Sequence, residues 1–207
     1  MIKKMSHLKK DKNILYTGFG DKGTTTLFDC KQTRISKSAI LIEALGSVDE
    51  LNAYLGIIKV YSDQLPTFPS KAGNSSLAGK KYSQIIAGIQ QNLFVIQAEL
   101  GGSKMYVAKK ELTKIENIIN KIGEVLPPIT SFTISGGSIL SSNLDFARTL
   151  ARKSERRVVS VSDEGSRVIS LNTLSYLNRL SSVLFAMSRY ANYLFSIKED
   201  HPDYNKK

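Results

Sequence analysis

The sequence has very few of the side chains that enzymes most often use for nucleophilic or metal catalysis. Its 207 residues include one cysteine, two histidines and no tryptophan. Cys30 cannot form a disulfide within the chain, which is typical of proteins in a reducing compartment. The chain has no H-E-x-x-H, C-x-x-C or E-x-x-H pattern, and both histidines lie in polar terminal segments. A transition-metal site built from protein side chains is therefore not expected.

Long hydrophobic runs are also missing. No uninterrupted apolar segment is long enough to span a bilayer, so no transmembrane helix is predicted. Residues 1–13 are basic but lack the apolar core of a secretory signal, and we interpret them as a basic flexible tail. Together with the single cysteine, these features favour a cytoplasmic protein that does not associate with membranes.

Acidic residues are scarce relative to basic ones. Twenty-nine Lys and Arg against eighteen Asp and Glu give a net charge of +11. This charge suits an anionic partner such as a nucleotide, a nucleic acid or an acidic lipid, although a basic solvated surface has the same composition. The aromatic residues lie mostly at core spacing without interleaved basic residues, so a nucleic-acid partner is not expected.

Beyond Ser38 the apolar residues follow a helical period, and strand patterns are almost absent. We predict an all-α five-helix bundle with an N-terminal Gly-rich nucleotide-binding loop, forming a single domain over residues 14–197. Residues 66–81 are rich in Gly, Ser and Lys and predict a surface loop or insertion, residues 132–134 a short extended piece, and residues 198–207 a polar tail. The expected helices are 40–61, 82–100, 109–122, 138–162 and 172–197.

The N-terminal region contains a G-x-G-x-x-G pattern at Gly18–Gly23, followed by three threonines. Glycines allow close backbone approach, and consecutive N–H groups can surround an anion. The β-branched run after Gly23 is a poor helix start, so the pattern lacks the context of a dinucleotide-binding fold. It is not a P-loop either, because Thr24 stands where lysine is required. A surface turn without a ligand is the alternative.

The fourth predicted helix carries an uneven distribution of charge. At 100° per residue, Arg148, Arg152 and Glu155 fall within about 60° of one another, with Arg156 beside them. Such a face can bind phosphate or carboxylate groups, although a solvated face with internal ion pairs has the same pattern. On the fifth helix, Asn178 lies among apolar residues and either connects helices or faces a ligand.

Five segments together resemble one family, the PduO-type ATP:cob(I)alamin adenosyltransferases. They occur in the family's order and extend over about residues 16–195. The segments are Tyr16–Phe28, Gly46–Asn52, Phe132–Ser138, Ala147–Val159 and Tyr176–Ser181, the last continuing to Asn192.

The resemblance implies a homotrimer with active sites between neighbouring subunits. It implies transfer of the 5′-deoxyadenosyl group of ATP to the cobalt of cob(I)alamin, giving adenosylcobalamin and triphosphate, with Mg²⁺ assisting. It further implies a flavoprotein reductant or an acceptor enzyme as a partner. A non-catalytic helical module that binds corrinoid or nucleotide is the alternative function.

The resemblance also assigns residues. Arg152, Lys22 and Glu155 would be catalytic, Phe132 would pack beneath the corrin ring and displace its lower nitrogen ligand, and Asp49 would pair with Arg148 across a subunit boundary. The positions that match the family's ATP site are Thr17, Gly20, Asp21, Lys22, Gly23, Thr24, Thr25, Lys37, Arg152, Glu155, Arg156 and Asn178.

The sequence departs from the family pattern at three points. Asp29-Cys30 replaces a usual pair of glycines, Ser38–Ile40 replaces an Asp-Pro-like step, and Lys153 replaces a frequent arginine. Lysine cannot reproduce a bidentate arginine contact. These differences concern the loop between residues 28 and 42 more than the reaction.

Overall fold

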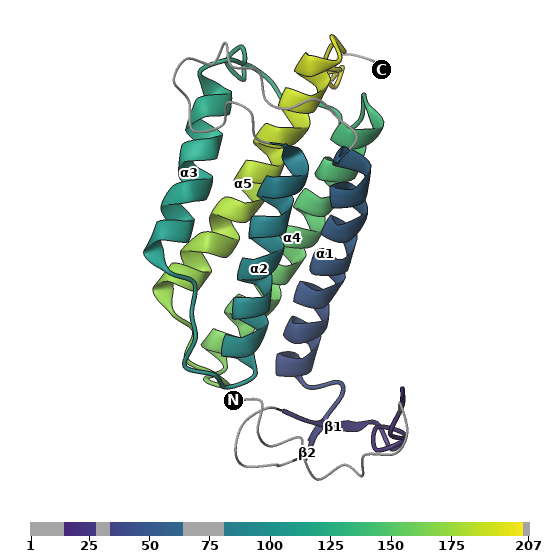
Figure 1. The fold of residues 1–207 in the computed structure, drawn as a ribbon, viewed down its shortest axis with the longest axis vertical. Helices are drawn as coiled ribbons and strands as arrows, with labels where there is room; N and C mark the ends of the chain where they lie inside the picture. Colours follow the sequence, from purple (N-terminus) through teal and green to yellow (C-terminus); the bar gives the residue numbers. More distant parts are fainter. Residues whose placement is uncertain (1–14, 28–33, 64–80, 205–207) are drawn as a thin grey trace.

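A computed structural model describes residues 15–27, 34–63 and 81–204 and contains five long helices (Figure 1). Consecutive helices run antiparallel, so that α1, α3 and α5 point one way and α2 and α4 the other. The predicted all-α five-helix class is confirmed. The helices are α1 (Ile40–Ser62), α2 (Tyr82–Leu100), α3 (Lys109–Gly123), α4 (Ile139–Asp163) and α5 (Leu171–Leu194).

The core lies between the helices and is continuous along the bundle. α4 packs against α1 and α5, α1 also packs against α2, and α3 packs against α5. On α5, Tyr176, Leu180 and Leu184 are fully buried. Burial of each such side chain contributes roughly 1.5–3 kcal/mol, which stabilises the bundle more than helix propensity does.

Two helix starts follow the capping rule. Ser138 accepts a hydrogen bond from the Ser141 amide at 3.0 Å, and Ser170 accepts one from the Thr173 amide at 3.1 Å. Each hydroxyl satisfies an amide that lacks a partner within the helix. The predicted C-terminus of the fifth helix, at residue 197, is wrong: α5 ends at Leu194, and Ser196 adopts a left-handed φ of 56°.

The N-terminal region forms a two-stranded ribbon that the sequence did not predict. Strands β1 (Thr24–Thr26) and β2 (Arg34–Ser36) pair antiparallel, with Thr25 opposite Ile35. The ribbon lies beyond the lower end of the bundle in Figure 1, next to the start of α1. Residues 132–134 lie at the opposite end and form no strand, although the Ile134 amide donates to the Asp200 carbonyl at 2.8 Å.

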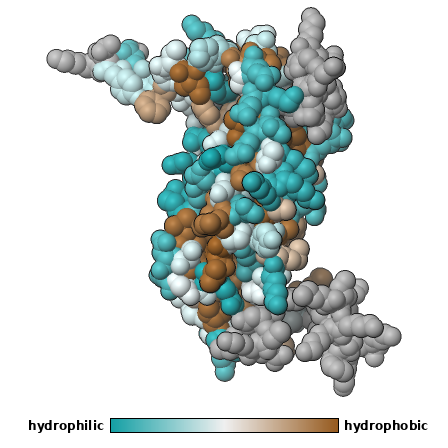
Figure 2. Space-filling model, turned by 90° about the vertical axis from the view of Figure 1, so that its left-hand side faces the viewer, coloured by the Kyte–Doolittle hydropathy of each residue, from teal (hydrophilic) through white to brown (hydrophobic). Residues whose placement is uncertain are grey.

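Several predicted segments lie outside the described residues. These are the basic tail 1–13, most of the surface loop 66–81, Cys30, and the end of the polar tail 198–207. Within the described ranges, none of the helices combines the length and the hydropathy needed to cross a membrane. Seen from the α3 side, the surface is mostly hydrophilic, with hydrophobic side chains gathered in a patch on its lower half (Figure 2).

Candidate functional site

The Gly-rich segment forms two successive turns before β1. The Asp21 amide donates to the Gly18 carbonyl at 3.2 Å, and the Gly23 amide donates to the Gly20 carbonyl at 3.1 Å. Gly18 and Gly23 have φ values of 69° and 70°, which other residues rarely adopt. The glycine pattern therefore has a conformational cause, independent of any ligand.

Arg34 holds this loop on the ribbon, a role that sequence reasoning missed. Its Nε donates to Thr24 Oγ1 at 2.8 Å, and its Nη2 donates to the Thr24 carbonyl at 2.8 Å and to the Phe19 carbonyl. These hydrogen bonds depend on the β1–β2 register, which no local sequence pattern predicts. Arg34 thus fixes the path of the backbone on which the predicted ATP ligands lie.

Lys37 lies against the same loop. Its amide donates to the Gly23 carbonyl at 2.9 Å, and its Nζ lies 2.8 Å from the position that a Cβ on Gly20 would occupy. A side chain at Gly20 would therefore displace the ammonium group. Lys37 and Thr25 line a pocket of about 450 Å³ together with residues of α1 and with Lys153 of α4.

The remaining loop residues are more open. Thr17, Asp21 and Lys22 are exposed, and Thr17 Oγ1 accepts a 3.4 Å hydrogen bond from the Phe19 amide. The loop therefore presents a cation, a carboxylate and a hydroxyl to solvent beside the Lys37 pocket.

A second pocket contains the predicted corrinoid residue. It has a volume of about 370 Å³ and brings together Phe132, Arg148 and Arg152, with Ser181 and Phe185 from α5. The Phe132 side chain is 78% exposed. A large apolar ring that faces solvent next to two guanidinium groups is the arrangement expected for a flat, partly apolar ligand with an anionic neighbour. This pocket has no lining residue in common with the Lys37 pocket.

Glu155 and Asn178 meet one turn after Arg152 on α4 and about one turn before Ser181 on α5. Asn178 Nδ2 donates to Glu155 Oε1 at 2.9 Å, and Asn178 Oδ1 accepts from Arg179 at 2.6 Å. Arg179 in turn pairs with Glu116 of α3 at 3.2 Å. The two predicted nucleotide residues are thus adjacent and oriented by a polar chain across three helices. Arg156 is exposed on the neighbouring face of α4.

Arg148 and Asp49 have other partners within the chain. Arg148 Nε lies 3.6 Å from Asp145 Oδ1, and its guanidinium carbon lies 6.0 Å from the centre of the Phe185 ring. Its buried Nε has no hydrogen-bond partner among the described residues. Asp49 is exposed and accepts a 3.2 Å hydrogen bond from Gln97. The α1–α4 ion pairs instead join Lys153 to Glu50 at 2.6 Å and Arg157 to Glu43 at 3.8 Å.

Asn192 and Asp145 support the segment that follows Phe132. Asn192 accepts from the Ser138 amide and donates to the Gly136 carbonyl, both at 2.9 Å. A Cβ on Gly137, whose φ is 102°, would lie 2.4 Å from Asn192 Oδ1. Burial raises the pKa of the Asp145 carboxyl, and the nearby Arg148 charge opposes this rise.

The comparisons with known proteins decide the family. The family model for cobalamin adenosyltransferase matches residues 15–191. The chain belongs to this family. It is 36% identical over 182 residues to the corrinoid adenosyltransferase PduO of Citrobacter freundii, covering 84% of this chain and 49% of that protein. A corrinoid adenosyltransferase of the same organism is 32% identical over 202 residues, covering 91% of this chain and 97% of its own length.

Solved structures give the same result. A variant of the PduO-type ATP:corrinoid adenosyltransferase from Lactobacillus reuteri, complexed with cobalamin and ATP, superposes with a TM-score of 0.77 at 29% identity. The alignment covers 94% of this chain and 98% of that one. A second variant, complexed with ATP, has a TM-score of 0.76 at 30% identity and covers 91% and 100%. The chain spans about half the length of the PduO relatives that it matches.

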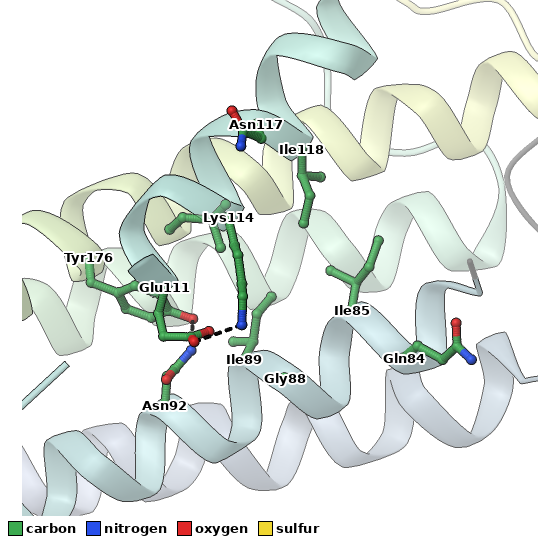
Figure 3. A pocket seen from close by; sticks show the side chains of 11 residues that line it. Gln84, Ile85, Gly88, Ile89, Asn92, Glu111, Lys114, Asn117, Ile118 and Tyr176 are labelled. Carbon is green, nitrogen blue, oxygen red and sulfur yellow. Dashed lines mark hydrogen bonds and ion pairs between the residues drawn. The ribbon is translucent and has the colours of Figure 1, made fainter. Parts of the chain in front are cut away.

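A larger pocket of about 710 Å³ lies between α2 and α3 and is separate from the predicted site of this adenosyltransferase family member (Figure 3). At its base the hydroxyl of buried Tyr176 accepts a 3.1 Å hydrogen bond from Asn92. At its side Lys114 donates to Glu111 at 2.7 Å, and this hydrogen bond lowers the pKa of Glu111. None of the residues assigned to ATP or corrinoid lines this pocket, so its size does not make it the reaction site.

Proposed function

We propose that this chain transfers the 5′-deoxyadenosyl group of ATP to the cobalt of reduced corrinoid. The observation that carries the proposal is the pocket in which exposed Phe132 faces the same space as Arg148 and Arg152. In this reaction a cobalt electron pair attacks C5′ of ATP, the C5′–O bond breaks, and triphosphate leaves. Because reduced cobalt is itself the nucleophile, the protein needs no Ser, Cys or His to attack.

Different residues would bind the triphosphate and the nucleoside of ATP. Arg152 would neutralise charge on the leaving triphosphate, with Lys22 and Lys37 placing further cations on the phosphates. Glu155 and Asn178, already hydrogen-bonded to each other, would orient the nucleoside. The Gly20–Thr25 loop would wrap the triphosphate through its backbone amides and hydroxyls, with Thr17 and Arg156 at the edges.

Phe132 would lie against the lower face of the corrin ring. A phenyl group cannot coordinate cobalt, so a ring held there loses its lower nitrogen ligand, which favours reduction to Co(I). The apolar surface also keeps water from a strongly reducing species.

Mg²⁺ would arrive with ATP. Among the residues that the structure describes, no group of three or more His, Cys, Asp or Glu could hold a metal ion. Mg²⁺ binds readily through phosphate oxygens, its own waters and one or two carboxylates. Exposed Asp21 on the loop would face that hydration shell, and the ion would supply charge stabilisation for the leaving triphosphate.

One active centre would use two subunits. The Gly-rich loop lies at one end of the bundle and the Phe132 segment at the other (Figure 1). We therefore assign the loop and Phe132 of a given site to neighbouring chains of a homotrimer, with Asp49 and Arg148 paired across the boundary. Exposed apolar side chains on α1 and α4, Ile57 and Phe146, support a subunit contact on that side.

The test is anaerobic turnover of chemically reduced cobalamin with ATP and Mg²⁺. The expected result is conversion of the corrinoid spectrum to that of adenosylcobalamin, with one triphosphate released per product. Corrinoid or ATP binding without triphosphate release would instead support the non-catalytic binding module. The reaction would take place in the cytoplasm, with a flavoprotein reductant or an acceptor enzyme as partner.

A further inference from the structure

A smaller pocket opens directly beside the Phe132 pocket. It has a volume of about 340 Å³ and lies where the end of α3, the α3–α4 connection and α5 meet. Ile129, Ser182 and Phe185 line both pockets, so they form a shared wall. On the far side of that wall the lining is almost entirely apolar: Ile119, Ile122, Gly123, Leu126, Pro127, Pro128 and Ala186, with Arg189 at one edge.

Arg189 and the proline segment of this pocket are held in place by hydrogen bonds within the chain. Arg189 pairs with Glu199 through two hydrogen bonds, at 2.6 and 2.9 Å, and also donates to the Pro127 carbonyl at 3.3 Å. Glu199 thus neutralises the Arg189 charge at the edge, and the described lining of the pocket offers an apolar surface. The adjacent prolines restrict the backbone, so little order is lost when a ligand enters.

The chemistry of the substrate supplies a matching group. A complete corrinoid carries a heteroaromatic base on a flexible tether, and this base coordinates cobalt from the lower face. A ring seated on Phe132 has no room for that contact, so the tethered base must go elsewhere. An aromatic group released beside an apolar pocket gains free energy by entering it.

We infer that this second pocket, here called the base pocket, binds the detached lower base of the corrinoid. The inference rests on the proposed function and extends it to substrate selection. Phe185 offers a ring for stacking, since its partner Arg148 lies on the side of the Phe132 pocket. The Ser182 hydroxyl lies between the two pockets and is available to a ring nitrogen.

The base pocket predicts a preference for complete corrinoids. Cobalamin should have a KM on the order of tenfold lower than cobinamide, which has the same ring but no base, as expected for burial of one aromatic group. The kcat values should be similar, because the reacting atoms are identical in the two substrates.

Gly123→Phe tests the pocket directly. A Cβ at Gly123 meets no atom within 4 Å, so an added ring can occupy the pocket without a backbone clash. The KM for cobalamin should rise about tenfold while the KM for cobinamide and for ATP stays unchanged. Gly88→Phe is the matched control, because Gly88 is also helical and open but lines the separate α2–α3 pocket. Gly123→Ala should keep the preference and the helical circular dichroism spectrum.

The outcomes separate this inference from the proposed function. Wild-type protein that adenosylates neither corrinoid refutes the proposed function. Turnover of both with equal KM, or a Gly123→Phe variant that weakens both equally, overturns the base pocket and leaves the transferase activity intact.

Discussion

Arg152 and Lys153 show how one step along a helix separates two roles. Successive residues on a helix point about 100° apart. Lys153 therefore reaches across to Glu50 of α1 at 2.6 Å, whereas Arg152 faces the pocket that holds Phe132. The lysine contributes little to stability, because both partners of its ion pair are about half exposed. The arginine lines the pocket to which we assign the leaving phosphate group.

Arg152→Ala should lower kcat by about 10²–10³-fold, as expected when one cation is removed from a developing anion. Steady-state turnover of reduced cobalamin measures this. Arg157→Ala is the control, because Arg157 is exposed and its ion pair with Glu43 is long, at 3.8 Å. An unchanged kcat in a folded Arg152→Ala protein would remove Arg152 from the mechanism.

Phe132→Ala should impair turnover that begins from Co(II) more than turnover from pre-formed Co(I). Loss of roughly 1–3 kcal/mol of apolar contact with the ring corresponds to about 5–150-fold in rate. Parallel assays with a protein reductant and with chemically reduced corrinoid give the comparison, and Phe94→Ala, on exposed α2 surface, serves as control. Equal losses in both assays would contradict the assigned role.

At the scale of the elements, the sequence predicted the helices, whose apolar residues repeat at a regular spacing. It did not predict the contacts between separate segments of the chain. The starts of α1, α2 and α3 agree with the structure because apolar periodicity is local. The β1–β2 ribbon and the Arg34 contacts depend on a register between segments that are ten residues apart. Five site segments could be recognised, yet the distribution of their residues over two separate pockets follows only from helix packing.

The Gly136–Ser138 segment depends on the absence of a side chain at Gly137. Gly137→Ala should cost about 1–3 kcal/mol and raise the corrinoid KM, because φ is positive and Asn192 must move. Urea denaturation measures the loss. Gly165→Ala is the control. Gly165 has a φ of 68°, but a Cβ there would meet no atom within 4 Å, so the substitution should cost only backbone strain of roughly 1–2 kcal/mol. If both variants lose the same stability, the Asn192 contact is unimportant.

The N-terminus of α5 is held by a buried carboxylate from α2. Glu99 accepts hydrogen bonds from the Ser170 amide at 2.7 Å and the Thr173 hydroxyl at 2.6 Å. Glu99→Ala leaves both donors unsatisfied and should lower the unfolding free energy by about 2–4 kcal/mol. Glu99→Gln retains one acceptor and should lose less, while exposed Glu164→Ala should be near neutral in the same denaturation experiment. A near-neutral Glu99→Ala would show that water replaces the carboxylate.

At the scale of the whole molecule, the two ends of the bundle carry different halves of the proposed site. Lys37 and the Gly-rich loop lie near the start of α1, and the α3–α4 connection that contains Phe132 lies at the other end. In a closed trimer, rotation about the threefold axis would bring the loop end of each chain to the Phe132 pocket of its neighbour. The exposed Ile57 and Phe146 side chains lie on the helices that such a contact would use.

This arrangement predicts complementation between inactive chains. Lys37→Ala and Arg152→Ala should each be nearly inactive alone, whereas trimers refolded from an equal mixture should regain about one quarter of wild-type activity. That fraction is the chance that a site receives its loop from the Arg152→Ala chain and its arginine from the Lys37→Ala chain. A mixture no more active than its separate components would place both halves in one subunit. Light scattering on the same samples checks the trimer.

His201, near the end of the chain, is a natural spectroscopic reporter of the segment that contains Phe132. Its Nδ1 lies 2.9 Å from both the Phe132 carbonyl oxygen and Ser131 Oγ. The protein has only one other histidine, His7 in the N-terminal tail, so the imidazole resonances of His201 can be assigned without labelling any single site. The arrival of a corrinoid at Phe132 can therefore be followed by NMR through an unmodified side chain, without attaching a probe to the site.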